Sequence, residues 1–315
     1  MKQFRDILVY AECDDQACLE QVVAVARAHG AAITVCEVVE PPPQMHDNRG
    51  VVERVSKLRW SRAFQRLRRI CDLFASHTVI DYSVFTGIPF ITITEQVVQQ
   101  DFDRVGHISE PLQAASGIGL NATGMHLMRK CPCTVWALHP EREPYSNDVV
   151  LALDREIASG TRAAEAFAMT LADSALGLAK ARNGNVHVVH AWQPYGAELL
   201  DDPELGLSDG EQQVFRQQQR SDSEQWFKRV VQRIESVSDD PLRVKAHLLE
   251  SRAIAAVGRM VADTNAGMLV LGTVGTSANP GVLIGATTES ILASIGTPVL
   301  ALKPPGFVTP LKFTR

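Results

Sequence analysis

The sequence predicts an α/β fold built as two tandem doubly wound domains, each with a parallel sheet covered by helices. Two observations predict this fold. Short apolar segments alternate with helical segments of more than ten residues, which is typical of parallel strands joined by right-handed crossovers. In addition, three strand segments of the first half recur in the same order in the second half.

The recurring strands share an apolar core and a similar end. The first pair ends in a carboxylate in both copies, the second follows a glycine after a helical stretch, and the third closes with a proline. The matched segments are 6–12 with 148–154, 32–38 with 186–192, and 135–140 with 299–304. We therefore predict a duplicated domain, with the first copy over residues 1–144 and the second over residues 145–315.

Helical segments fill the intervals between these strands. Their apolar residues recur at spacings of three and four, which is the period of an amphipathic helix. The helices are predicted over residues 16–29, 50–76, 159–182 and 210–236. The segments 40–49 and 193–210, rich in Pro, Gly and Asp, are predicted as loops that leave the second strand of each half.

Composition excludes several classes of protein. The 315 residues are 45% hydrophobic and 21% charged, as in an ordinary soluble globular protein. The net charge of -5 gives no reason to expect nucleic acid or an anionic membrane as a partner. No apolar run is long enough for a membrane-spanning helix, and the N-terminus has no signal-peptide core. We therefore expect a cytoplasmic protein.

The cysteines also indicate a cytoplasmic location. All six lie in the first half, without zinc-finger spacing or accompanying histidines, which fits a reducing cytoplasm. Cys131 and Cys133 are a candidate redox or metal pair. They flank an apolar strand, however, and cysteines in that position are more often structural.

A glycine-rich segment near the C-terminus carries the strongest chemical signal. Residues 272–287 follow the apolar run 268–271 and precede a helical pattern. Glycines let backbone N–H groups approach an anion closely, and a helix N-terminus adds partial positive charge. The spacing of Gly272, Gly275 and Gly285, G-x2-G-x9-G, is neither a P-loop nor a dinucleotide fingerprint. The residues alone therefore predict a phosphate cradle of another kind.

This motif resembles the nucleotide-binding signature of the universal stress protein family. In that family a serine or threonine usually follows the last glycine, whereas this chain has Ala286 there and Thr287 one position later. With the repeats, the resemblance covers nearly the whole chain. It implies the sheet order 3-2-1-4-5 in each domain, with ATP or a related adenine nucleotide between the ends of strands 1 and 4. Ligands usually bind at such a point, because the crossovers leave adjacent strands in opposite directions.

The resemblance also assigns site residues in the second half. Asp154 matches the family's strand-1 aspartate, which accepts hydrogen bonds from a purine or ribose edge; the alternative is a helix N-cap. Ala152 and Ala191 match positions that line the adenine, and both are equally natural as small core residues. The nucleotide-binding residues expected are Ala152, Asp154, Ala191, Leu271, Gly272, Gly275, Gly285, Ala286 and Thr287.

The first half repeats the fold signals without this site. Counting back from the matched closing strands places Ile108, Pro111 and Asn121 at the positions of the three glycines, and Glu12 replaces the aspartate. Proline has no N–H to donate, and side chains occupy the space that phosphates need. We therefore expect one nucleotide site per chain.

Two further patterns have ordinary structural explanations. Arginines recur along one face of the 50–76 helix, where a solvated face is favoured over a surface for RNA or an acidic partner. These arginines are Arg59, Arg62, Arg66 and Arg69. His187 and His190 are three residues apart in a strand, so they lie on opposite faces and are not expected to share a metal ion.

The sequence contains no catalytic motif set and no lysine in the cradle. We therefore predict a nucleotide-binding stress-response protein that acts as a sensor or adaptor through protein partners and is not an enzyme. One alternative is a nucleotide-free protein that binds a protein partner or an apolar ligand between its domains, and another is a slow ATPase. The last strands, 135–138 and 299–302, are expected to pair with each other. The chain is then a pseudo-dimeric monomer or a homodimer.

Overall fold

The structure is a computed structural model that describes residues 5–13, 15–42, 49–109, 112–114, 117–140, 145–154, 162–273 and 284–313. Its contacts divide the chain into two compact units. The first unit comprises residues 1–144, 280–284 and 292–315, and the second comprises residues 145–279 and 285–291. The contacts group the end of the chain, residues 292–315, with the first unit. The predicted domain limits, residues 1–144 and 145–315, stay a prediction.

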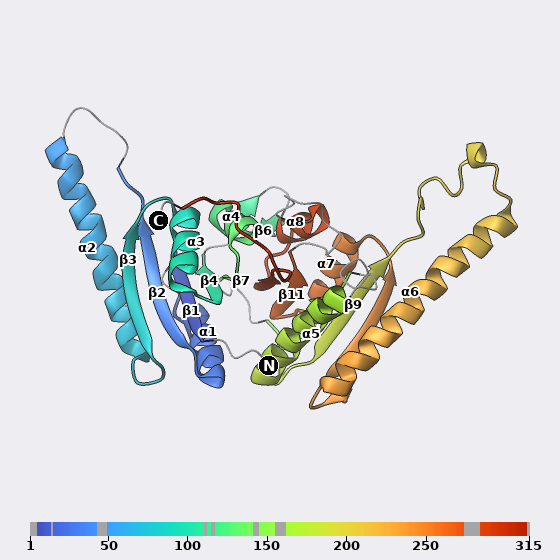
Figure 1. The fold of residues 1–315 in the computed structure, drawn as a ribbon, viewed down its shortest axis with the longest axis horizontal. Helices are drawn as coiled ribbons and strands as arrows, with labels where there is room; N and C mark the ends of the chain where they lie inside the picture. The colour runs from blue at the N-terminus through green and yellow to red at the C-terminus, as the bar shows by residue number, and fades with distance from the viewer. Residues whose placement is uncertain are drawn as a thin grey trace. The chain divides into compact units, whose positions relative to one another are not determined.

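The first unit is built on a parallel sheet with strand order β3-β2-β1-β4-β7 (Figure 1). The strands are β1 (Asp6–Ala11), β2 (Ala32–Val39), β3 (Ile80–Thr86), β4 (Arg104–Ile108) and β7 (Thr134–Leu138). This is the order 3-2-1-4-5 that the family resemblance implies. Central strands of a parallel sheet are covered on both faces, and β1 accordingly buries every residue from Ile7 to Ala11.

Helices and one short hairpin connect these strands. The helices are α1 (Gln16–His29), α2 (Arg49–Phe74), α3 (Pro89–Gln100) and α4 (Ala122–Lys130), and the hairpin strands are β5 (Leu112–Ala114) and β6 (Gly117–Gly119). Local signals explain the limits of α1. The Asp15 side chain accepts a hydrogen bond from the Cys18 N–H, and Gly30 ends the helix in the left-handed conformation at a φ of 66°.

The last strand of the chain, β12 (Val299–Leu302), also belongs to the first unit. It runs antiparallel to β7, with Val299 opposite Ala137 and Ala301 opposite Val135. All residues of β12 are buried. The predicted pairing of the two closing strands is therefore confirmed.

The second unit contains a parallel sheet with strand order β10-β9-β8-β11. Its strands are β8 (Val149–Ala152), β9 (Val186–Trp192), β10 (Val244–Glu250) and β11 (Met268–Gly272). Its helices are α5 (Arg162–Arg182), α6 (Asp209–Val237), α7 (Ala253–Thr264) and α8 (Ala286–Leu292), with short 3₁₀ turns η2 (Pro203–Leu205) and η3 (Pro241–Arg243). The order repeats the 3-2-1-4 part of the first sheet, as a duplication requires.

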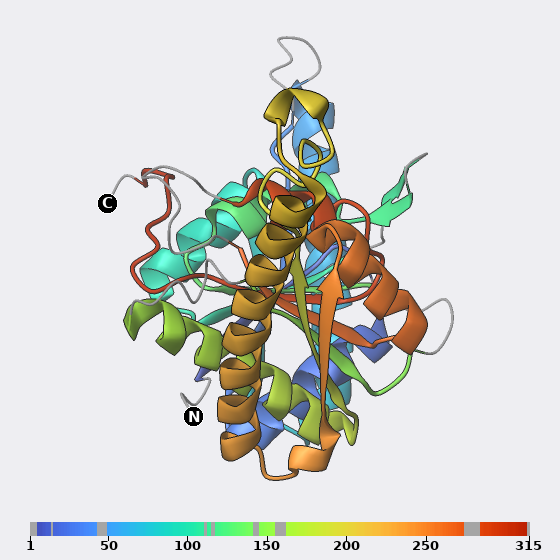
Figure 2. The ribbon, with the colours of Figure 1, turned by 90° about the vertical axis from the view of Figure 1, so that its right-hand side faces the viewer.

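Helix α6 lies along β9 and β10 (Figure 2). It begins with a capping box, in which Ser208 and Glu211 bond each other's backbone N–H groups. Trp226 and Phe227 of this helix pack against the buried His190 ring of β9, at centroid distances of 4.5 and 5.9 Å. This packing fixes α6 on one face of the sheet.

Among the helices that the structure describes, none is both long and apolar enough to cross a membrane.

Candidate nucleotide site

The sheet of the second unit changes its direction of connection between β8 and β11. Strand β8 pairs in parallel with β9 on one side and with β11 on the other. Helix α5 connects β8 to β9, whereas α7 leads from β10 into β11. Adjacent parallel strands connected in opposite directions leave a crevice at their carboxyl ends, which is the usual ligand position in such sheets.

Asp154 lies at this edge, two residues after the end of β8. The segment between them is fixed by β9, because the Leu153 N–H donates to Val189 O at 2.9 Å. The His190 ring nitrogen Nδ1 also lies 3.0 Å from Leu153 O. The Asp154 side chain is exposed at the end of this anchored segment. It therefore stands where a ligand in the crevice would meet it.

The end of β11 and the start of α8 are bonded to each other. The Gly285 N–H donates to Thr273 O at 2.9 Å, and the Thr288 hydroxyl donates to Gly272 O at 3.2 Å. The first and last glycines of the motif, thirteen residues apart in sequence, are thus brought together at the carboxyl edge of β11. Gly275, the middle glycine, lies outside the described residues.

Among the residues that the structure describes, nothing in the packing requires a glycine at position 285. A Cβ atom there would meet Thr288 Oγ1 at 3.8 Å and Thr273 O at 3.9 Å, which are ordinary van der Waals distances. Its φ also lies outside the left-handed region that favours glycine. The described neighbours would therefore accept a small side chain next to the first turn of α8.

The remaining predicted site residues flank this space or belong to the sheet. Ala286 and Thr287 are exposed at the start of α8, whereas Leu271 is buried in β11. Ala152 and Ala191 are half-buried strand residues, opposite Val189 and Leu249 respectively. The structure therefore brings Gly272, Gly285 and the start of α8 together and leaves the roles of the two alanines undecided.

The corresponding edge of the first unit has a different construction. Ile108 ends β4 and Asn121 directly precedes α4, as Gly272 ends β11 and Gly285 directly precedes α8. The sequence-based correspondence of these positions is thus reproduced by the elements. Pro111 is not among the residues that the structure describes.

Side chains fill this edge of the first unit. The Asn121 amide donates to Glu12 Oε2 at 2.6 Å and accepts from the Gly124 N–H at 2.8 Å. The other carboxylate oxygen of Glu12 lies 3.3 Å from His107 Nε2. His107 is fully buried and stacks on Tyr10 at a centroid distance of 5.5 Å. The network occupies the position at which the second unit has a glycine.

The network also makes this edge acidic. Burial alone would raise the pKa of Glu12, but hydrogen bonds from His107 and Asn121 and the charge of His107 lower it below its usual value. Glu12 is therefore an ionised carboxylate at neutral pH. A phosphate group placed here would meet a negative charge.

Comparisons with known proteins agree with this arrangement of elements. The model of the universal stress protein family matches residues 148–303. The chain belongs to the universal stress protein family.

Similar proteins extend the match beyond that segment. The chain is 20% identical to Universal stress protein E of Photorhabdus laumondii over 328 aligned positions, covering 100% of both chains. It is 24% identical to Universal stress protein E of Salmonella typhi, covering 73% of this chain and 70% of that one. Among solved structures, a universal stress protein from Archaeoglobus fulgidus matches with a TM-score of 0.62 and 14% identity, over 96% of this chain and 99% of that chain. The last match supports the fold alone.

This universal stress protein has a second polar cluster that the sequence did not indicate. His187 Nε2 lies 3.2 Å from Asp148 Oδ2, and His187 Nδ1 lies 3.0 Å from His247 Nε2. Asp148 is oriented by two bonds from Asn185 to its other oxygen. His190 faces α6 instead, so the predicted placement of His187 and His190 on opposite faces is confirmed. In the part of the chain that the structure describes, no group of three metal-binding side chains occurs.

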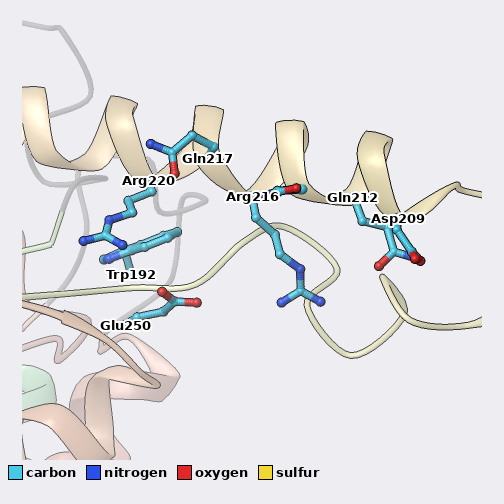
Figure 3. Close-up of a pocket in the computed structure, with 8 residues that line it drawn as sticks. Trp192, Asp209, Gln212, Arg216, Gln217, Arg220 and Glu250 are labelled. Carbon is cyan, nitrogen blue, oxygen red and sulfur yellow. The ribbon is translucent and has the colours of Figure 1, made fainter.

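In this universal stress protein, a cavity of about 360 Å³ lies between α6 and the ends of β9 and β10 (Figure 3). Figure 3 shows Arg220, Trp192 and Glu250 grouped at one end and Asp209 at the other. Its two arginines are paired with acids, Arg216 with Asp201 at 3.0 Å and Arg220 with Glu224 at 2.8 Å. The cavity is therefore polar without an excess of unpaired positive charge.

The basic face of α2 is mostly solvated, in line with its prediction. Arg59, Arg62 and Arg69 are exposed, and Arg66 forms an ion pair with Glu37 of β2. One of the four arginines thus has a structural partner within this universal stress protein.

Proposed function

We propose that this stress-response protein binds ATP or a related adenine nucleotide in its second unit, at the carboxyl ends of β8 and β11. The observation that supports the proposal most is the glycine at position 285, since neither the packing of the described residues nor the backbone conformation accounts for a glycine there. A glycine beside a helix start lets phosphate oxygens approach backbone N–H groups. The nucleotide's phosphates would lie against Gly272, Gly275, Gly285 and the start of α8.

The nucleoside end would lie near Asp154. A carboxylate accepts hydrogen bonds from ribose hydroxyls or from an amino group of the base. Asp154 is exposed at the same edge as Gly272, on the strand that pairs with β11. Thr287 is the first hydroxyl of α8 and is exposed, so it offers a phosphate donor one position later than the family pattern.

The same residues support binding without efficient catalysis. Residues 272–287 contain no lysine, histidine or carboxylate. Neutral backbone donors hold phosphates, but hydrolysis also needs a group that positions or deprotonates water and charge that stabilises the transition state. We therefore propose a sensor or adaptor that signals its nucleotide state to protein partners in the cytoplasm.

A titration with a fluorescent adenine nucleotide tests the proposal. Gly285→Val fills the open position and should abolish binding while the protein stays folded, because a Cβ atom fits there. Gly177→Val is the matched control, since a Cβ atom at Gly177 of α5 would meet no described atom within 4 Å. This control should bind as the wild type does. If wild-type protein shows no binding up to about millimolar nucleotide, at which a complex is worth only about 4 kcal/mol, the proposal is wrong.

A further inference from the structure

A pair of cysteines in the first unit lies outside the proposed nucleotide site. Cys131 directly follows α4, and Cys133 directly precedes β7. Their sulfur atoms are 3.5 Å apart. Cys131 is buried and Cys133 is half-buried as a residue. Both are free thiols.

The surroundings of this pair contain buried cations. Lys303, which directly follows β12, donates its ammonium to Met128 O at the end of α4 and lies 4.3 Å over the Phe307 ring. Burial lowers the pKa of Lys303 to about 8 despite the two nearby sulfurs. Arg104 of β4 is fully buried and also acts electrostatically on Cys133. Two positive side chains therefore act on one dithiol.

The pKa values of the two thiols are shifted in opposite directions. Burial by itself would raise the pKa of Cys131, but the hydrogen bond with Cys133 and the charge of Lys303 lower it. For Cys133, burial, the Cys131 sulfur and Asp103 raise the pKa, against a smaller opposite effect of Arg104. Within the pair, Cys131 is therefore the more acidic sulfur and the one that forms the thiolate first.

We propose that Cys131 and Cys133 form a redox-active dithiol, which closes to an intrachain disulfide when the protein meets hydrogen peroxide. The sulfurs must approach by roughly 1.5 Å to reach the length of a disulfide bond. Rotation of the two side chains at the bend between α4 and β7 supplies such a movement. Hydrogen peroxide, a molecule little larger than water, would reach the Cys131 sulfur past the half-buried Cys133.

The reaction proceeds in two balanced steps. The Cys131 thiolate attacks one oxygen of hydrogen peroxide and breaks the O–O bond, which gives a sulfenic acid and hydroxide. The Cys133 sulfur then attacks the Cys131 sulfur, the S–O bond breaks, and water leaves with the Cys133 proton. The hydroxide takes up the proton that Cys131 lost earlier. In total two thiols are oxidised and one peroxide is reduced to two waters.

Tryptic peptide mapping tests this proposal directly. Cleavage after Lys130 and Arg142 releases a peptide that contains Cys131 and Cys133 and no other cysteine. The folded full-length protein is treated with hydrogen peroxide, denatured, alkylated and digested. The expected result is a peptide 2 Da lighter than the dithiol form, without alkyl groups, that dithiothreitol converts back. If both cysteines of the peptide remain alkylated, or are found only as sulfinic or sulfonic acids, the proposal is wrong.

Variants test whether Cys131 and Cys133, and not the other cysteines, form the disulfide. Cys133→Ser should abolish the 2 Da loss, whereas Cys13→Ser, another half-buried cysteine, should keep it. Lys303→Gln removes the cation near Cys131 and should slow disulfide formation about three- to tenfold. An unchanged rate in a folded Lys303→Gln variant would contradict the role given to Lys303. A disulfide between either cysteine and Cys13 would overturn the pairing itself.

Discussion

The Asn121 amide and the Glu12 carboxylate, 109 residues apart in sequence, form a 2.6 Å hydrogen bond at the carboxyl edge of the first sheet. Asn121 stands directly before α4, at the position that Gly285 has before α8. The two halves of the chain thus place a bonded side chain and an open glycine at equivalent positions. Duplication has retained the fold in both units, and the structure shows different chemistry at the two edges.

Asn121→Ala is expected to destabilise the first unit by about 1–3 kcal/mol. The substitution removes the N-cap of α4 and leaves the half-buried Glu12 carboxylate without one of its donors. Urea unfolding measures this change in the free energy of unfolding. Gln99→Ala, an exposed position of α3, serves as the control and should change stability by less than about 0.5 kcal/mol. Equal stability of the two variants would show that the network does not stabilise the fold.

Ala301→Lys is expected to destabilise the protein by about 3 kcal/mol or more, because it places an ammonium group in a fully buried strand pair. Val308→Lys is the matched control in the same C-terminal segment, since Val308 is 78% exposed. Thermal melting and limited proteolysis give the melting temperature and the cleavage pattern of both variants. If Ala301→Lys keeps the wild-type melting temperature and cleavage pattern, the pairing of β12 with β7 is wrong.

The histidine cluster of the second unit should make stability depend on pH. Burial, and next the neighbouring His187, lower the pKa of His247 below its unfolded value of about 6.5. The unfolded chain therefore binds more protons than the folded chain just below that pH. The free energy of unfolding should rise as the pH increases towards about 6.5 and then level off.

Comparison of variants assigns this pH dependence to the cluster. His247→Gln should reduce the slope of stability against pH below about 6.5, as measured by urea unfolding at several pH values. Lys245→Gln changes the charge of the same strand, beside His187 in the register, but removes no imidazole. It should leave the slope unchanged. A slope that is the same in His247→Gln and wild type would contradict the predicted contribution of His247.

Local sequence signals explain why much of the fold was predictable. The predicted helix 16–29 agrees with α1, because Asp15 and Gly30 mark its limits and its apolar residues recur at helical spacing. The pairing of β7 with β12 was predictable because each strand is a short apolar run that would otherwise leave an open sheet edge. The assignment of the chain's last segment to the first unit was not expected from the domain limits.

The polar networks were not predictable, because their members are far apart in sequence. His187 and His247 are separated by 60 residues, and Lys303 and Met128 by 175. Periodicity places each residue on a face of its own element but does not give the rotation of one element against another. The glycine motif was recognisable from spacing alone, whereas the ordinary van der Waals distances around a Cβ atom at Gly285 are a property of the folded chain.

Ala286→Ser is expected to strengthen nucleotide binding about two- to tenfold, which corresponds to roughly 0.5–1.5 kcal/mol for one added hydrogen bond. Ala286 is exposed at the start of α8, so the new hydroxyl can reach a phosphate without repacking. Competition titration with a fluorescent nucleotide measures the gain. Ser290→Ala, one turn further along α8, removes a hydroxyl that bonds Ala286 O and should leave the affinity unchanged. An equal affinity in Ala286→Ser and wild type would place the phosphates away from this turn.

Isothermal titration calorimetry with ATP tests the central claim most directly, because it gives the number of sites per chain. We predict one site, which is lost in Gly285→Val and retained in Glu12→Gln, since Gly285 belongs to the open edge of the second unit and Glu12 to the filled edge of the first. Two equivalent sites per chain, or a single site that survives Gly285→Val, would contradict this account.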